Sequence, residues 1–336
     1  GDLEAVDVNS EFIDPQTNEK GVLPSIHQKI ALHHIMNERR FGVWDGGGTG
    51  KTAIGVLAQP LIERELQKQG KEFRRAVIVC SNPAKKTWRK GLLGNEEERY
   101  LSEKQDAIII DGETKDEKFL EELEKKKWIV LNHEQLTTEI KVNGEKRIFA
   151  DFLVGMGIDY VIFDESHNLK TLRRRTNKGN PTYSAAARKV ALSADYFVPM
   201  SATPISNGLK DFAVQYHLLS PETLPNPDDF LELISNSPRV LYSFFHEKSV
   251  RRNSEEINDD LDWSEREAEV KLDPIQKKVY NYIVEVRPVG WLQQARKSLV
   301  DPRLVNPKIL KEAGVLGQVS WRNSSKYKEL EKLLTE

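Results

Sequence analysis

Short apolar runs alternate with longer amphipathic stretches along the first two thirds of the chain. Each run holds four or five residues without regular polar alternation, which is typical of strands buried on both faces of a sheet. The stretches between them, such as 53–67, are long enough for crossover helices. The pattern predicts an α/β fold, a doubly wound parallel sheet with flanking helices. The six predicted strands are 41–44, 76–80, 107–110, 128–131, 160–163 and 196–200.

The strand pattern fades after the segment 221–227. Three prolines within residues 221–227 predict an exposed connector. Residues 228–336 form a smaller, mainly helical extension in this interpretation. Acidic residues without periodicity occupy 1–20 and predict a loosely held lead-in. We therefore expect an acidic lead-in over 1–20, an α/β lobe over 21–227 with the first ordered residues near Leu23, and a helical region over 228–336.

Two apolar faces are predicted in the helical region. One helix presents Ile275, Val279, Tyr282 and Ile283 on a single face. The last helix begins with serine caps and is predicted to carry a second apolar stripe, which needs a partner. That stripe comprises Tyr327, Leu330, Leu333 and Leu334.

Composition narrows the class of protein. The 336 residues are 38% hydrophobic and 30% charged, so the chain can bury a sizeable core. A single cysteine, Cys80, excludes a disulfide framework and a cysteine-based zinc cluster, and it suits a reducing compartment, the cytoplasm or, in a eukaryote, the nucleus. No apolar run approaches the roughly 18 residues of a membrane span, so no membrane contact is expected. The net charge of −2 means that any nucleic-acid surface must be a local patch.

A glycine-rich loop follows the first predicted strand and precedes a helical stretch. Glycines allow successive backbone N–H groups to surround phosphate oxygens, and the following helix adds its positive N-terminal end. The lysine supplies a charge to the β- and γ-phosphates, and the hydroxyl after it ligates Mg²⁺. The residues predicted to bind ATP in this way are Gly46, Gly47, Gly48, Thr49, Gly50, Lys51 and Thr52.

Two adjacent carboxylates end the predicted strand 160–163. Ligands of open α/β sheets bind at the carboxyl edge of the strands, so Asp164 and Glu165 should lie near the phosphate loop. Asp164 is predicted to hold Mg²⁺ together with Thr52, and Glu165 to orient the attacking water. After the strand 196–200, Ser201 and Thr203 form a weaker signal, because small hydroxylic residues also bond local backbone in turns.

In this order, the motifs resemble those of helicase superfamily 2, and more closely those of SWI/SNF-type ATPases that move along double-stranded DNA. Residues 45–52 are similar to the D-E-x-G-x-G-K-T loop, 164–167 to the D-E-x-H box and 201–207 to the T-G-T-P-x-x-N motif. The resemblance implies a RecA-like first motor lobe. It also implies that Gln28, in the segment 23–28, reads adenine, that Lys51, Asp164, Glu165 and His167 are catalytic, and that Ser201 and Thr203 couple the nucleotide site to the nucleic-acid face.

Basic clusters supply candidate nucleic-acid contacts. Lys85 and Lys86 follow the strand 76–80 within 82–88, which resembles a loop of the family that touches DNA. Arg173, Arg174 and Arg175 follow the carboxylate box and could grip duplex DNA, or could form a mobile basic loop.

The resemblance extends past the sheet to 250–252, 272–280, 301–305 and 325–326, which are similar to segments that bridge the two lobes of the family. A second RecA-like lobe, which donates arginines to the transferring phosphate, is expected beyond Glu336. Without those arginines, this chain should hydrolyse ATP slowly, since an arginine finger is worth about 10³–10⁵ in rate. The alternatives are another superfamily 2 motor, such as an RNA helicase or a restriction-type translocase, and a non-motor ATP-binding regulator.

Overall fold

The computed structural model describes residues 24–95, 98–101, 103–112, 116–169, 182–205, 208–223, 227–257 and 270–335. The predicted lead-in over 1–20 and the predicted start near Leu23 lie outside these ranges. The chain divides into two compact units, residues 1–261 and 262–336, and each is described by itself.

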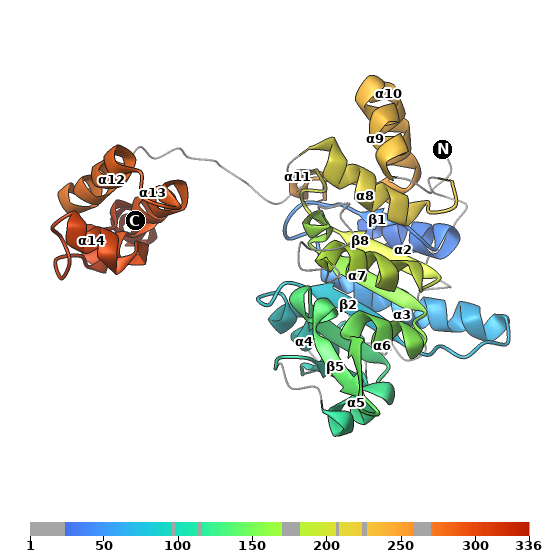
Figure 1. The fold of residues 1–336 in the computed structure, drawn as a ribbon. Helices are drawn as coiled ribbons and strands as arrows, with labels where there is room; N and C mark the ends of the chain where they lie inside the picture. Colours follow the sequence, from blue (N-terminus) through green and yellow to red (C-terminus); the bar gives the residue numbers. More distant parts are fainter. Residues whose placement is uncertain are drawn as a thin grey trace. The chain divides into compact units, whose positions relative to one another are not determined.

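Within the described residues, seven parallel strands form the sheet of the first unit (Figure 1), in the spatial order β3-β4-β2-β7-β8-β1-β9. All six predicted strands are present, and the predicted fold class is confirmed. Two central strands match their predicted limits to the residue. The strands in chain order are β1 (Gly42–Val43), β2 (Ala76–Cys80), β3 (Ala107–Ile109), β4 (Trp128–Asn132), β7 (Tyr160–Asp164), β8 (Tyr196–Met200) and β9 (Ser249–Val250).

Helices cover both faces of this sheet, as the uninterrupted apolar strands predict. Alternate side chains of β2 point to opposite faces, with Val77 and Val79 in one buried cluster and Ile78 and Cys80 in the other. The second cluster includes the buried faces of α2 (Ile26–Glu38), α3 (Lys51–Lys68) and α4 (Lys85–Leu93). The first includes α5 (Glu117–Glu124), α6 (Phe149–Gly155), α7 (Tyr183–Leu192), α8 (Leu209–Leu219) and α9 (Pro227–Asn236).

The first unit continues past the predicted boundary at residue 227. The short strand β9 pairs in parallel with β1, and α10 (Pro238–Glu247) packs Phe244 and Phe245 against the first buried cluster. The break between units therefore falls after residue 261 rather than at 227. A strand of two residues is too short to show a hydrophobic pattern, which explains why the sequence did not indicate β9.

An antiparallel hairpin was also missed by the sequence analysis. It consists of β5 (Glu139–Val142) and β6 (Glu145–Ile148), which are largely charged and exposed. Its turn residues Asn143 and Gly144 have φ of 51° and 80°. An Asn-Gly pair is the strongest short hairpin signal, so the sequence did contain an indication of this element.

The second unit is helical, as predicted. It contains α12 (Pro274–Val286), α13 (Trp291–Val300), α14 (Pro307–Glu312) and α15 (Ser325–Thr335). Val279 and Ile283 of the predicted apolar face are fully buried. It also contains the 3₁₀ turns η3 (Pro302–Leu304) and η4 (Trp321–Asn323). The remaining short elements belong to the first unit and are α11 (Ser254–Ile257) and the 3₁₀ turns η1 (Glu134–Thr137) and η2 (Ser166–Asn168).

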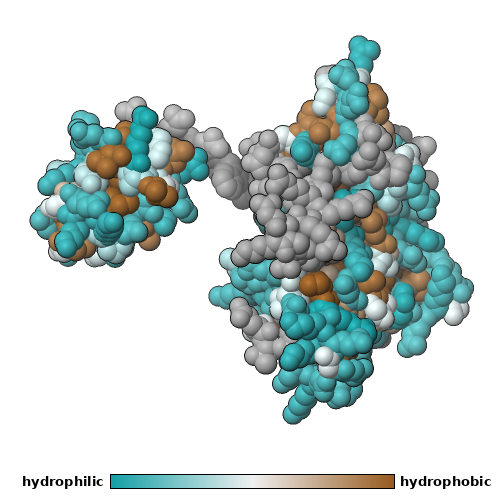
Figure 2. Space-filling view, viewed as in Figure 1, coloured by the Kyte–Doolittle hydropathy of each residue, from teal (hydrophilic) through white to brown (hydrophobic). Residues whose placement is uncertain are grey.

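Apolar side chains remain exposed on the second unit, and some are visible on the face drawn in Figure 2. Tyr327 and Leu330, two members of the predicted stripe, are 46% and 50% exposed. The side chains of Leu333 and Leu334 lie outside the description. Among the described residues, no helix has the length and apolar character needed to cross a membrane.

Candidate nucleotide-binding site

The predicted phosphate loop runs from the end of β1 to the first turn of α3. Gly48 and Gly50 have φ of +75° and +78°, a region that favours glycine. A Cβ on Gly48 would meet no atom within 4 Å, whereas one on Gly50 would lie 2.5 Å from Nε2 of Gln28. The loop is open on one side and closely packed on the other. Because α3 has 18 residues, its N-terminus offers amides and a favourable dipole to an anion.

Lys51 is held inside this loop. Its ammonium donates to the carbonyl oxygens of Asp45 at 2.8 Å and Gly46 at 2.6 Å. Burial lowers the pKa of Lys51, while the nearby carboxylates of Glu165 and Asp45 act in the opposite direction. The lysine is therefore fixed by backbone oxygens, facing the end of β7.

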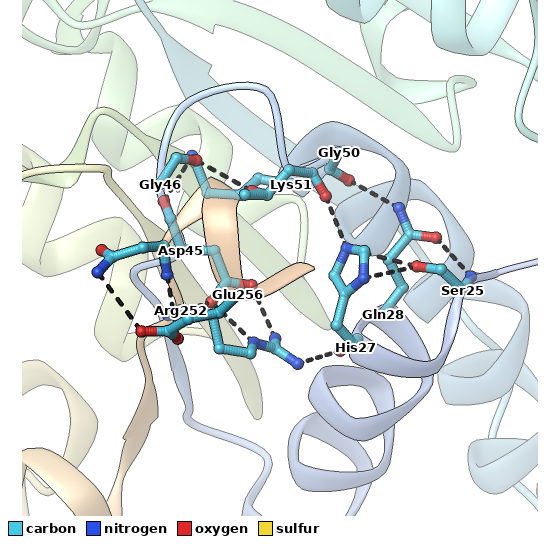
Figure 3. A network of polar contacts seen from close by, with 11 residues as sticks. Ser25, His27, Gln28, Asp45, Gly46, Gly50, Lys51, Arg252 and Glu256 are labelled. Atoms are coloured by element: carbon cyan, nitrogen blue, oxygen red, sulfur yellow. Dashed lines mark hydrogen bonds and ion pairs between the residues drawn. The ribbon is translucent and has the colours of Figure 1, made fainter. Parts of the chain in front are cut away.

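A buried ion pair anchors the first residue of the loop (Figure 3). Asp45 is fully buried and accepts from the Arg252 backbone N–H at 3.0 Å, from its Nε at 3.1 Å and from a terminal guanidinium nitrogen at 2.7 Å. The other terminal nitrogen donates to the His27 carbonyl at 2.6 Å, and Gly46 N–H donates to the Arg252 carbonyl at 2.8 Å. Arg252 thus joins the loop to the end of β9 and to α2.

Gln28 and its neighbours lie against the other end of the loop (Figure 3). Gln28 is 8% exposed, and its side-chain oxygen accepts from Ser25 N–H at 3.0 Å, which caps the start of α2. Its Nε2 lies 3.5 Å from the Gly50 carbonyl, at the limit of a hydrogen bond. The ring of His27 contacts the Thr49 carbonyl at 2.9 Å. The predicted adenine reader is therefore packed beside the loop.

The carboxylate box lies at the carboxyl end of β7. Asp164 accepts from Glu165 N–H at 3.1 Å through one oxygen and from the indole N–H of Trp88 at 2.9 Å through the other. Glu165 has a φ of 55°, which is unusual for a non-glycine residue and costs about 1–3 kcal/mol. Its side chain is 43% exposed. Trp88 binds the carboxylate of Asp164, whereas the ring of His167 lies beside that of Glu165.

The predicted coupling residues lie next to this box. Nδ1 of His167 is 3.1 Å from a Glu165 carboxylate oxygen and 3.0 Å from the Ser201 hydroxyl. The same hydroxyl accepts from Thr203 N–H at 3.1 Å. Ser201 is fully buried, whereas Thr203 is exposed. The structure therefore brings two segments that are distant in sequence, 165–167 and 201–203, into one hydrogen-bonded group.

The residues present fit a magnesium ion that is held mainly by nucleotide and water. Thr52 stands in the first turn of α3. Each oxygen of Asp164 accepts one hydrogen bond from the described residues and has a further lone pair with which it can bind an ion or water. Mg²⁺ usually binds one or two protein oxygens together with substrate phosphates and waters. No cluster of three or more His, Cys, Asp or Glu side chains that could hold a metal occurs in the described part of the chain.

The predicted nucleic-acid contacts have different outcomes. Lys86 is exposed at the start of α4. Lys85 is 5% exposed, and its ammonium donates to the Ile110 carbonyl at 2.5 Å and to the side-chain oxygen of Gln135 at 3.4 Å. Since this ammonium points inward, the prediction that Lys85 contacts a phosphate is corrected: the residue anchors α4. Arg173, Arg174 and Arg175 lie outside the described residues.

Sequence reasoning missed two partners of the site. Trp88 is fully buried, as is typical of a core aromatic residue, but its indole also donates to Asp164. Arg252 belongs to a segment noted only for its family resemblance. Neither partnership has a local sequence signal, because 76 and 207 positions separate the partners.

Comparison with known proteins places the chain in a family. Residues 18–206, more than half of the chain, match the family described as "Type III restriction enzyme, res subunit". This chain belongs to that family. Among the curated relatives of this family member is a protein named "DNA repair and recombination protein RAD54-like" from Drosophila ananassae. It is 27% identical, and the match covers 57% of this chain and 22% of the relative. Putative protein p41 of Acyrthosiphon pisum secondary endosymbiont phage 1 is 26% identical over 57% of this chain and 38% of its own length.

The fold has a solved counterpart. The Sulfolobus solfataricus SWI2/SNF2 ATPase core in complex with dsDNA matches with a TM-score of 0.51 and 17% identity, over 92% of this chain and 63% of that chain. The sequence-based recognition of a SWI/SNF-type motor lobe of helicase superfamily 2 is confirmed by the family, the relatives and the fold together. The chain spans between about a fifth and two fifths of the length of the curated relatives it matches.

Proposed function

We propose that this chain is the ATP-binding first motor lobe of a DNA-dependent ATPase that couples ATP hydrolysis to translocation on double-stranded DNA. The observation that carries the proposal is the common position of the phosphate loop and the carboxylate box. Lys51 interacts electrostatically with both Asp164 and Glu165 although more than 110 positions separate them in sequence. A phosphate-binding lysine facing two carboxylates is the arrangement that phosphoryl transfer to water requires.

Each residue has a role in this proposal. The amides of 46–50 and the ammonium of Lys51 bind the β- and γ-phosphates, while Gln28 contacts the base. Thr52 and Asp164 hold Mg²⁺, which when bound supplies positive charge to the phosphate oxygens. Glu165 orients and deprotonates the attacking water. Its contact with His167, which in turn lies beside Ser201, supports a role for His167, Ser201 and Thr203 in linking the site to the polymer.

Double-stranded DNA is the proposed polymer. In support, the Drosophila ananassae relative is named a DNA repair and recombination protein, and the structural counterpart is described in complex with dsDNA. Lys86 and the arginines 173–175 are the proposed contacts in this chain. Hydrolysis is expected to be slow until a second RecA-like lobe contributes its arginines. The proposed site of action is the compartment that holds the cell's DNA.

A restriction-type translocase of superfamily 2 is the second candidate, and the family match favours it specifically. It shares the ATPase chemistry and differs in the partners that direct it. An RNA helicase or a non-motor ATP-binding regulator would use the same phosphate loop.

The test is steady-state phosphate release by the natural protein that carries this chain, compared without polymer and with single-stranded DNA, double-stranded DNA and duplex RNA at one fixed salt concentration, because polymer binding depends on salt. Selective stimulation by double-stranded DNA is expected. Stimulation by RNA would indicate a helicase, and ATP binding without stimulation by any polymer would indicate a regulator. Glu165→Gln should abolish hydrolysis while ATP binding persists. Unchanged turnover in this variant would contradict the assignment of Glu165.

A further inference from the structure

The indole of Trp88 occupies a position that core packing alone does not explain. Trp88 lies on α4, outside the phosphate loop and the carboxylate box, and is fully buried between α3 and the sheet. Its Nε1–H donates to Asp164 at 2.9 Å. Among the described residues, Trp44 and Trp128 are equally buried, but their indole nitrogens have no hydrogen-bond partner. Burial in this core therefore does not by itself require a partner for an indole.

The ring of Trp88 is closely packed. Gly55 of α3 stands against the ring, and a Cβ at that position would lie 2.9 Å from the edge of the indole. The same Cβ would lie about equally close to Met200 and Ile162, at 3.0 and 3.1 Å. The missing side chain at Gly55 thus makes room for the six-membered ring, and close packing fixes the direction of its N–H.

The helix that carries Trp88 is fixed one turn earlier. Lys85 donates inward to the Ile110 carbonyl and to Gln135. Gln135 in turn accepts from the Asn132 backbone N–H at 2.9 Å, and the Asn132 side chain donates to Asn82 at 2.8 Å. The loops after β2 and β4 are therefore connected to α4, and α4 is connected to Asp164 through Trp88.

We propose that Trp88 is a positioning residue that orients the Asp164 carboxylate for Mg²⁺. This inference rests on the proposed function, because it assumes that Asp164 serves the metal. A donor that occupies one carboxylate oxygen fixes the plane of the group and leaves a defined lone pair for the ion or its water. Groups that orient metal ligands in this way typically change metal affinity by about 10- to 100-fold when they are removed.

The test compares Trp88→Phe with Trp128→Phe as the matched control. Both variants replace a fully buried indole by a smaller ring, but only the first removes a hydrogen bond to Asp164. ATP binding is measured by calorimetry with excess Mg²⁺ and again with EDTA, and thermal unfolding is recorded for each variant. For Trp88→Phe we expect the gain in ATP affinity that Mg²⁺ provides to fall by about 10-fold or more. The ATP affinity measured in the presence of EDTA should not change. Trp128→Phe should keep the wild-type gain.

An equal Mg²⁺ gain in both variants would overturn the proposal. If wild-type protein binds no ATP, or gains nothing from Mg²⁺, the proposed function fails instead, so the two failures are distinguishable. A second measurement uses the wild-type protein and depends neither on ATPase activity nor on how well a variant folds. The chain has six tryptophans, so the indole N–H signal of Trp88 can be assigned in the ¹⁵N NMR spectrum by its loss in Trp88→Phe. That signal should shift when Mg²⁺ and ADP are added, and the Trp128 signal should not; a stationary Trp88 signal would also count against the proposal.

Discussion

Replacing Arg252 by methionine should destabilise the first unit strongly. The variant keeps an unbranched apolar stem at this position but leaves the Asp45 carboxylate, which is fully buried, with only the backbone N–H of residue 252 as a donor from that residue. Two side-chain hydrogen bonds to Asp45 are lost, and the His27 carbonyl loses the hydrogen bond from the guanidinium. Removal of one partner from a buried pair typically costs about 3–5 kcal/mol, because the remaining charge is left uncompensated.

Lys248→Met is the matched control. Lys248 forms an ion pair with Glu38, so it also joins the β9 region to α2, but its side chain is 22% exposed and that of Glu38 is 36% exposed. Pairs accessible to solvent contribute at most about 1 kcal/mol. Urea denaturation should therefore separate the two variants by several kcal/mol. The transition of the first unit is fitted separately, because two compact units need not unfold together.

A rescue distinguishes the loss of charge compensation from a loss of packing. Adding Asp45→Asn to Arg252→Met removes the buried charge, so the double variant should be more stable than Arg252→Met alone. ATP binding should weaken in Arg252→Met, since the carbonyls of Asp45 and Gly46 hold Lys51. If Arg252→Met costs no more than Lys248→Met, or if Asp45→Asn gives no rescue, the reasoning about the buried pair is refuted.

Two further predictions concern the phosphate loop and His133, which directly precedes η1. Gly50→Ala combines a positive φ of 78° with a Cβ only 2.5 Å from Gln28, so ATP affinity should fall well below that of Gly47→Ala, whose Cβ meets no atom within 4 Å; similar affinities in calorimetry would contradict this. Burial lowers the pKa of His133 to about 4. Between pH 6.5 and about 4 the unfolded histidine binds a proton that the folded one does not, so stability falls as the pH falls through this window, by up to about 1.4 kcal/mol per pH unit. His133→Gln should flatten the dependence of the unfolding free energy on pH over that range; an unchanged slope would show that His133 does not titrate as described.

The sheet and the phosphate loop could be predicted from the amino-acid sequence. Strands such as β2 and β8 can be recognised in the sequence because burial on both faces favours apolar residues at every position. The phosphate loop can be recognised because its glycines, Lys51 and Thr52 must be contiguous to surround one phosphate group. Its residues therefore form a continuous sequence motif. The Asp164–Glu165 pair could also be predicted as part of the site, because it comes directly after a strand, at the sheet edge where ligands bind.

The residues that support these groups can be identified only from the folded chain. Arg252 reaches Asp45 and Trp88 reaches Asp164 because the sheet brings distant segments together, and no local spacing encodes such contacts. Charge in the sequence did not distinguish Lys85, which is buried and bonded to carbonyls, from the exposed Lys86 next to it. On a helix, adjacent residues point about 100° apart, so one lysine can anchor the helix while its neighbour faces solvent. The pairing of β9 with β1 likewise depends on two residues that carry no pattern of their own.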